Sequence, residues 1–453
     1  MTGGLFYSHP GSAMLPPLTE GAARGNTGPI IEGAMKTVLI SLFLARFAAA
    51  YLLRYLNLRH LKRHGATVPE GFTGAIDQEA LEKSARYTME QHRVGLAESV
   101  YDSALLLAFL FTPLFPLYDR FIASLSGSYL VQGLLFMLII YLAQSILEIP
   151  FSLYNTFHLE RRYGFNTMTP GLWVSDFLKS LLISALLMGV LVSGALLLVR
   201  HSPELWWLWV WAFFALFSIT MIYLSPYVIE PLFSKFEPLS DPGLEAEIRV
   251  MLYRAGIEVK GVLQMDASRR SLHSNAYFTG IGHVKRIVLY DTLLKQMDRQ
   301  ELLAILAHET GHWKKGHIWK QLLLMESVAL ALFFLVHRLI AWGGLPGLFG
   351  HQDASFPAQV LLVSFILSIA SFPFTPVGSW LSRRNEREAD RFAVALSRAP
   401  QALASALVKL ACENLSNLHP HPLYAGFYYS HPPVVERVAA LRAMKEPDPR
   451  RNN

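Results

Sequence analysis

The sequence predicts an all-α polytopic membrane protein, with seven transmembrane helices and a folded region on one side of the bilayer. Three observations point to this fold class. Hydrophobic residues make up 52% of the chain and charged residues 16%, whereas soluble domains contain about 25% charged residues. Seven apolar segments approach the length of about 20 residues that a helix needs to cross a bilayer. Lysine and arginine are concentrated in alternate loops, as the positive-inside rule describes.

We expect the seven spans around residues 37–57, 104–118, 129–147, 181–199, 205–224, 322–344 and 358–381. Arg46 interrupts the first span, and the second is short and contains Pro113 and Pro116. The alternative is that these segments are core helices of a large soluble protein. The segment 181–199 argues against it, because it has no polar face that could turn toward water.

The basic residues predict the orientation of the spans. The segments 58–103, 148–179, 225–320 and 382–453 contain 33 of the 40 lysine and arginine residues. We therefore expect these segments in the cytoplasm, with the N-terminus outside. The cytoplasmic loops also account for the net charge of +6. No basic cluster interleaved with aromatic residues suggests a surface that reads bases, so no nucleic-acid partner is expected.

Between the fifth and sixth spans lies the only sizeable polar stretch. DPGLEAEIRVMLYRAG predicts a helix with Asp241 as N-cap and Gly256 as its stop. GVLQMD and KRIVLYD predict short strands, and HSNAYFTG lies between them. Asn275 and Tyr277 share one face of this extended segment, whose edge could pair with the backbone of a bound peptide. The alternative for Asn275 is an ordinary turn residue.

The sequence His308-Glu309-Thr310-Gly311-His312 predicts a zinc site. Residues four apart project from one face of a helix, so the two histidines can bind the same metal. Glu309 lies beside them and can take a proton from the water that zinc activates. A capping box at 298–301 marks the start of this helix. The alternative is a chance match, since the pattern fixes only three positions.

A catalytic zinc site has three protein ligands, so a third ligand is required. Glu386 in SRRNEREADRFAVAL is the best candidate. Asp390 follows one turn later on the same face, where it can hold a ligand histidine by its second ring nitrogen. The alternative is a solvated helix face on which Glu386 pairs with Arg383 or Arg387.

His317 is a weaker candidate for the third ligand. It lies nine residues after His308, on the opposite face of a continuous helix, so we expect it to be exposed or interfacial. Gly316 could end the helix and leave the direction of His317 open. The predicted topology places both motif histidines and Glu386 on the cytoplasmic side, as a shared zinc requires.

His431 in YYSHPPVVERV is a candidate catalytic residue. Pro432 and Pro433 fix an extended backbone before the last expected helix. A hydrogen-bonding group near zinc would stabilise the negative charge that develops on a carbonyl oxygen during amide hydrolysis. The alternative is a structural histidine.

Six segments together resemble the successive signature blocks of the type I CAAX prenyl proteases. They are IPFSLYNTFHLERRYGFNTMTP, SLHSNAYFTG, KRIVLYDTLL, LAILAHETGHWKKGH, NEREADRFA and YYSHPPVVERV. The resemblance covers about residues 35–445, in the same order. It implies an integral-membrane zinc metallopeptidase whose seven helices enclose a chamber, with one zinc ion per chain.

The resemblance also implies roles for individual residues. His308, His312 and Glu386 match the zinc ligands, Glu309 the general base and Asp390 the carboxylate behind a ligand. Asn275 matches a residue on the strand that lies beside bound peptide, and Tyr277 is on the same extended segment. His431 matches a residue near the scissile carbonyl, and Arg437 an arginine that helps to position the substrate.

We therefore divide the chain into a flexible leader (1–35), a membrane region with five spans (36–224), a zinc metallopeptidase region with two (225–445) and a polar tail (446–453). The expected partners are the lipid bilayer and peptide or protein substrates, prenylated C-termini among them. The segments HPHPLY and MDASRRS resemble bacterial members of the family, which favours a location in a bacterial inner membrane. A eukaryotic source would place the protein in the endoplasmic reticulum membrane. The alternatives are a quality-control protease without prenyl specificity, a non-catalytic membrane chaperone and a zinc transporter.

Overall fold

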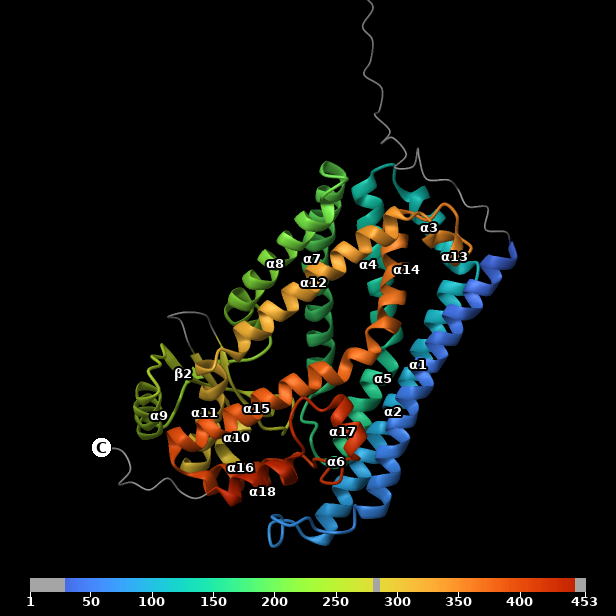
Figure 1. Cartoon of the computed structure of the whole chain (residues 1–453). Helices are drawn as coiled ribbons and strands as arrows, with labels where there is room; N and C mark the ends of the chain where they lie inside the picture. Colours follow the sequence, from blue (N-terminus) through green and yellow to red (C-terminus); the bar gives the residue numbers. More distant parts are fainter. Residues whose placement is uncertain (1–28, 280–285, 445–453) are drawn as a thin grey trace, which may run out of the picture.

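The computed structural model describes residues 29–279 and 286–444 (Figure 1). The predicted polar tail and residues 1–28 of the predicted leader lie outside the described residues. The first helix, α1 (Pro29–His64), begins within the segment predicted as a flexible leader. That prediction is therefore wrong for residues 29–35, which are helical.

The predicted membrane-spanning fold is confirmed. Among the described residues, six helical segments are long and apolar enough to cross a membrane, or seven if a bent pair of helices counts as one span. The spans contain α1, α2 (Gln78–Phe111), α4 (Tyr129–Leu147), α7 (Pro170–His201), α8 (Trp206–Leu224), α12 (His317–Ala341) and the pair α14 (Phe356–Ala370) and α15 (Thr375–Ser397). In the most apolar part of the six single spans at most 11% of the residues are buried inside the protein, as helices that face lipid require.

The predicted limits of two spans are wrong. The segment 104–118 is not one span, because α2 ends at Phe111 and Pro113 caps a separate helix, α3 (Leu114–Leu125). A proline interrupts the hydrogen bonds of a helix, which explains the break. The seventh span bends by 43° between α14 and α15, where the 3₁₀ turn η5 (Phe372–Phe374) intervenes. The third ligand candidate, Glu386, therefore lies on the same helix as the second half of this span.

A four-stranded sheet lies between the fifth and sixth spans. Its strands are β1 (Phe236–Pro238), β2 (Gly261–Met265), β3 (Ala276–Thr279) and β4 (Arg286–Tyr290), in the order β1-β2-β4-β3. β2 and β4 are parallel, and the other two pairs are antiparallel. The two predicted strands are confirmed, whereas β1 was not predicted. Among the described residues β3 is an edge strand, so one side of its backbone is free of strand pairing.

The predicted helix after the fifth span is α9 (Pro242–Arg254), and its N-cap is confirmed. Leu244 N–H donates a 2.9 Å hydrogen bond to the side chain of Asp241. The other helices are α5 (Ile149–Tyr154), α6 (Arg161–Tyr163), α10 (Asp291–Gln296), α11 (Arg299–Lys314), α13 (Leu345–Leu348), α16 (Pro400–Glu413), α17 (Pro422–Tyr428) and α18 (Val434–Ala443). The π-helical segments are η1 (Asn155–Glu160) and η2 (Ser225–Ile229), and the remaining 3₁₀ turns are η3 (Glu230–Leu232) and η4 (Ala267–Arg269).

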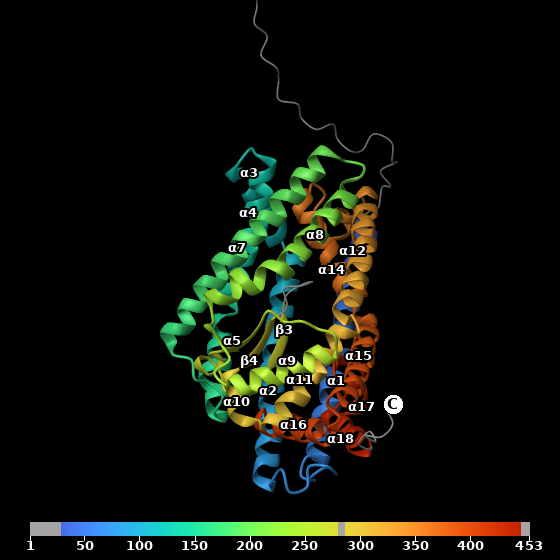
Figure 2. The same ribbon diagram turned by 90° about the vertical axis from the view of Figure 1, so that its left-hand side faces the viewer.

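The two larger of three hydrophobic clusters among the described residues lie at opposite ends of the molecule. One surrounds α9, α11, α16 and the sheet, and it contains Ile248, Ile287 and Leu306. The other surrounds α3, α13 and α14 and contains Phe115 and Leu362. Figures 1 and 2 show the sheet, α11, α16 and α18 together at one end of the spans, with α3 and α13 at the other. The first core is the rigid support of the candidate site.

Candidate active site

The start of α11 is held by two sets of hydrogen bonds. Glu301 N–H donates to Asp298 Oδ1 and Asp298 N–H donates to Glu301 Oε2, both at 2.9 Å, so the predicted capping box is confirmed. The buried Glu301 carboxylate also accepts from Ser405 Oγ and Lys409 Nζ, each at 2.7 Å. These contacts attach α11 to α16 and fix the axial position of His308 and His312, which lie about two and three turns further along the helix.

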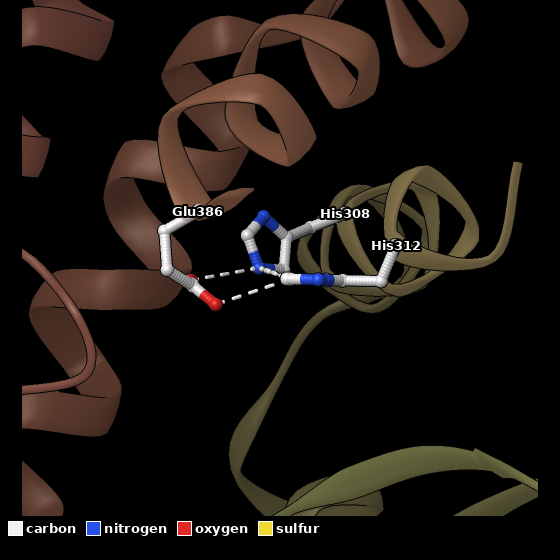
Figure 3. Close-up of side chains that lie close together, drawn as sticks. All are labelled: His308, His312 and Glu386. Carbon is white, nitrogen blue, oxygen red and sulfur yellow. Dashed lines mark hydrogen bonds and ion pairs between the residues drawn. The ribbon is translucent and has the colours of Figure 1, made fainter. Parts of the chain in front are cut away.

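The side chains of His308, His312 and Glu386 converge from α11 and α15 (Figure 3). The two Nε2 atoms lie 3.2 Å apart, His308 Nε2 is 3.3 Å from Glu386 Oε2, and His312 Nε2 is 3.2 Å from Glu386 Oε1. Ligands at the corners of a tetrahedron around zinc, with bonds of about 2.0–2.1 Å, are separated by about 3.3–3.4 Å. The spacing of the three side chains therefore fits zinc.

The burial of Glu386 also fits a metal. Its side chain is 5% exposed, and its Oε2 atom accepts no hydrogen bond of good geometry although nitrogen atoms surround it. A buried carboxylate oxygen without a hydrogen bond is costly unless a cation satisfies it. The alternative of a solvated face, with Glu386 paired to Arg383 or Arg387, is wrong, because Glu386 is buried. Arg383 instead donates to the backbone carbonyls of Ala425, Gly426 and Tyr429 at 3.1, 3.0 and 2.7 Å.

The second ring nitrogen of His308 has a charged partner. His308 Nδ1 lies 2.8 Å from Asp390 Oδ1, and Arg437 donates to both oxygens of Asp390 at 2.7 and 3.0 Å. Burial lowers the pKa of His308, but its contacts with Asp390 and Glu386 outweigh burial and raise that pKa to about 9. In the absence of a metal, His308 therefore carries a proton that a bound cation has to displace.

The second ring nitrogen of His312 faces His317. The two Nδ1 atoms are 3.1 Å apart, and His317 Nε2 lies 3.2 Å from Glu388 Oε2. The expectation that His317 is exposed or interfacial is wrong, since its exposure is 3%. The reason is Gly316, which adopts a left-handed conformation (φ 66°) and starts a new helix, α12, in a different direction.

His431 reaches the site from the segment between α17 and α18. Its Nδ1 atom lies 2.7 Å from Glu386 Oε2, while 59% of its side chain is exposed. Pro432 behind it is buried, which fixes the backbone of this segment. His431 thus combines contact with a ligand carboxylate and access to an incoming molecule, as a residue that touches substrate requires.

Glu309 lies next to this group on α11 and is partly buried. Desolvation raises the pKa of Glu309 above its ordinary value, whereas the charges of His308 and His312 act in the opposite direction. The negative charge of Glu386 also raises this pKa, and the electrostatic interaction with His431 lowers it. A carboxylate with a raised pKa is a stronger base than an ordinary glutamate.

The edge strand β3 packs against α11. Asn275, just before the strand, has an exposed side chain, and its carbonyl accepts a 3.1 Å hydrogen bond from Tyr290 N–H. The Tyr277 hydroxyl donates to Glu230 Oε2 at 2.7 Å, so it is already occupied by a contact to η3. The roles of Asn275 and Tyr277 in substrate binding stay predictions.

Comparisons with known proteins agree with this architecture. Residues 57–235 match a family described as the CAAX prenyl protease N-terminal region with five membrane helices, and residues 238–445 match peptidase family M48. A CAAX prenyl protease 1 homolog of Arabidopsis thaliana is 34% identical over 85% of the chain and 93% of the relative. CAAX prenyl protease 1 of Saccharomyces cerevisiae is 31% identical over 91% of the chain and 96% of the relative. The chain belongs to the CAAX prenyl protease 1 family. The crystal structure of S. mikatae Ste24p superimposes with a TM-score of 0.84 at 29% identity, over 90% of the chain and 99% of Ste24p.

As a member of this family, the protein is a multi-pass membrane metalloprotease. The structure brings together seven of the predicted site residues, which are His308, Glu309, His312, Glu386, Asp390, His431 and Arg437. Reasoning from the sequence missed His317 and Glu388 as neighbours of a ligand. The one signal for them was Gly316, whose left-handed conformation turns the chain toward α15.

Proposed function

We propose that this protein is a zinc endopeptidase that removes the C-terminal tripeptide from prenylated C-a-a-X substrates, with its site facing the cytoplasm. The observation that carries the proposal is the convergence of His308, His312 and Glu386 at the spacing of zinc ligands, with Glu309 beside them. The names of the relatives supply the substrate class, since they are called CAAX prenyl proteases.

In this proposal His308, His312 and Glu386 hold one zinc ion per chain. When bound, zinc activates water and polarises the scissile carbonyl. Glu309 takes a proton from the attacking water and delivers it to the leaving amine, which its raised pKa favours. The exposed His431 donates a hydrogen bond to the carbonyl oxygen as negative charge develops there.

Asp390 and Arg437 act behind the ligands. Asp390 accepts from the second nitrogen of His308, which holds the imidazole in the orientation needed for metal binding. We expected Arg437 to position the substrate. Because its guanidinium donates twice to Asp390 and only 10% of its side chain is exposed, we propose that it orients Asp390 instead.

The substrate would bind in an extended conformation along β3. A peptide can add to the free edge of a sheet through backbone hydrogen bonds, and β3 is an edge strand packed against α11. The exposed Asn275 would contact the peptide at the start of this strand. A prenyl chain would hold the substrate at the bilayer while its C-terminus reaches the site. The chamber between the helices stays a prediction.

The placement of the ligands argues against a zinc transporter. A transport path would place ionisable residues within the spans, across the membrane. Here both histidines lie on α11, outside the helices that are apolar enough to cross a membrane, and only Glu386 lies on a helix of a span, in the half of the seventh span that follows its bend. A base next to the ligands also serves hydrolysis and has no part in transport.

Cleavage of a farnesylated C-a-a-X peptide by the full chain in detergent tests the proposal. The non-prenylated peptide, a chelator and Glu309→Ala are run beside it, and the exposed Glu258→Gln serves as the matched control. We expect release of the terminal tripeptide by the wild type and Glu258→Gln, and none with chelator or Glu309→Ala. Equal cleavage of both peptides would favour a general membrane protease. No cleavage of either peptide by protein that contains zinc would contradict the proposed function.

A further inference from the structure

His317 connects the predicted zinc ligand His312 to a carboxylate on a different helix. It is the first residue of α12, its exposure is 3%, and both of its ring nitrogens have partners. Nδ1 lies 3.1 Å from His312 Nδ1, and Nε2 lies 3.2 Å from Glu388 Oε2. The imidazole planes of the two histidines are inclined by 75°, with ring centroids 5.1 Å apart, so they meet edge to face and not as a stack.

The proton positions follow from the direction in which His312 points. Its Nε2 atom faces His308 and Glu386, so it must be free of a proton when it binds a metal. A neutral imidazole then carries its proton on Nδ1 and donates it. His317 Nδ1 is the acceptor, and the proton of His317 therefore lies on Nε2, where it is donated to Glu388. Each N–H donor in this series of hydrogen bonds, from His312 through His317 to Glu388, therefore has an acceptor.

We propose that His317 is a positioning residue that fixes the orientation and tautomer of His312, and that Glu388 fixes His317 in turn. This inference rests on the proposed function, since it assumes that His312 binds zinc. A hydrogen bond to the second nitrogen of a ligand histidine typically contributes a factor of about 10–100 in metal affinity. The two predicted histidine ligands are then supported differently, His308 by the carboxylate of Asp390 and His312 by a neutral imidazole.

The connection joins three helices. His312 lies on α11, His317 opens the membrane span α12, and Glu388 lies on α15 beside the third ligand. Lys315 Nζ lies 3.6 Å from Glu388 Oε1 and balances the negative charge of this partly exposed carboxylate. The orientation of His312 consequently depends on how α12, the sixth span, packs against α15.

Zinc affinity tests the role of His317. The full chain in detergent is stripped of metal, and its Kd for zinc is measured by competition with a chromophoric chelator. Four variants are compared with the wild type: His317→Leu, His317→Asn, Glu388→Gln and His337→Leu. Asparagine keeps an acceptor oxygen near the position of histidine Nδ1, whereas leucine keeps only the bulk. His337→Leu makes the same change on the same helix, beside Trp206 and Trp207.

We expect His317→Leu to raise the Kd roughly 10- to 100-fold, His317→Asn to stay close to the wild type and His337→Leu to leave the Kd unchanged. Glu388→Gln should give a smaller rise than His317→Leu, because the imidazole of His317 remains. Thermal unfolding of the metal-free variants shows whether each has folded. An unchanged Kd in a folded His317→Leu, or equal rises in the leucine and asparagine variants, would overturn the inference alone. A wild type that binds no zinc would overturn the proposed function with it.

Discussion

Gly311 lies directly against the backbone of Ala389, at the crossing of the two helices that supply the predicted metal ligands. A β-carbon on Gly311 would lie 3.0 Å from the Cα and 3.1 Å from the carbonyl oxygen of Ala389. Such distances are shorter than van der Waals contact, and a backbone cannot turn aside as a side chain can. The absence of a side chain at Gly311 therefore sets how close His308 and His312 come to Glu386.

Gly311→Ala should separate α11 from α15. Overpacking of a buried contact typically costs about 1–3 kcal/mol, and a misplacement of about 1 Å in a catalytic group can lower the rate about 100-fold. We expect a lower melting temperature, weaker zinc binding and a loss of kcat/KM of that order. Gly378→Ala is the matched control on α15, because a β-carbon there meets no atom within 4 Å. Zinc content and activity equal to the wild type in Gly311→Ala would show that the spacing is not set here.

Arg383 determines the position of His431 without touching it. Its guanidinium donates to three carbonyls at the end of α17, the last of which belongs to Tyr429. Arg383→Gln should release this segment, since hydrogen bonds to a charged group each contribute roughly 1.5–3 kcal/mol. We expect kcat to fall by at least about tenfold, with zinc content unchanged because His431 is not one of the three predicted ligands. Arg384→Gln, an exposed neighbour, should behave as the wild type. Loss of zinc in Arg383→Gln would mean that the segment supports the metal itself.

Zinc binding should release a proton from His308. The pKa of His308 without metal is about 9, above its ordinary value, so the imidazole is protonated near neutral pH and a proton competes with the metal. The apparent zinc affinity should therefore rise with pH up to about pH 9, with about one proton released by His308 for each zinc bound near pH 7. Calorimetry in two buffers of different ionisation enthalpy measures this number. A binding enthalpy that is the same in both buffers would contradict the prediction.

The sequence located the apolar segments but did not predict how far their helices run. Apolar composition marks only the residues that contact lipid. α1 continues beyond its apolar segment to His64, and α2 begins before its apolar segment, at Gln78. The two helices pack against each other. The stability of these extensions comes from packing, which a window of hydropathy does not contain. The break after α14 had a local signal in Pro373 and Pro376, and the prediction of one continuous span overlooked it.

The predicted zinc ligands were accessible from the sequence because their spacing is local. His308 and His312, like Glu386 and Asp390, are one turn apart, and this spacing alone places each pair on one face. The partners of Arg383 lie more than 40 residues away in the chain, so only the fold reveals them. The contacts of His317 are an intermediate case. Its neighbourhood depends on the sign of one dihedral angle at Gly316, and residue spacing does not determine that sign.

The zinc content of two purified variants tests the assignment of Glu386 as the third zinc ligand and of Glu309 as the base. Glu309→Ala and Glu386→Ala each remove one carboxylate from the same site, and we assign these two carboxylates different roles. We predict that Glu309→Ala retains about one zinc per chain but cleaves no peptide, whereas Glu386→Ala loses most of its zinc together with its activity. Full zinc occupancy in Glu386→Ala would contradict the assignment of the third ligand, and with it the proposed site.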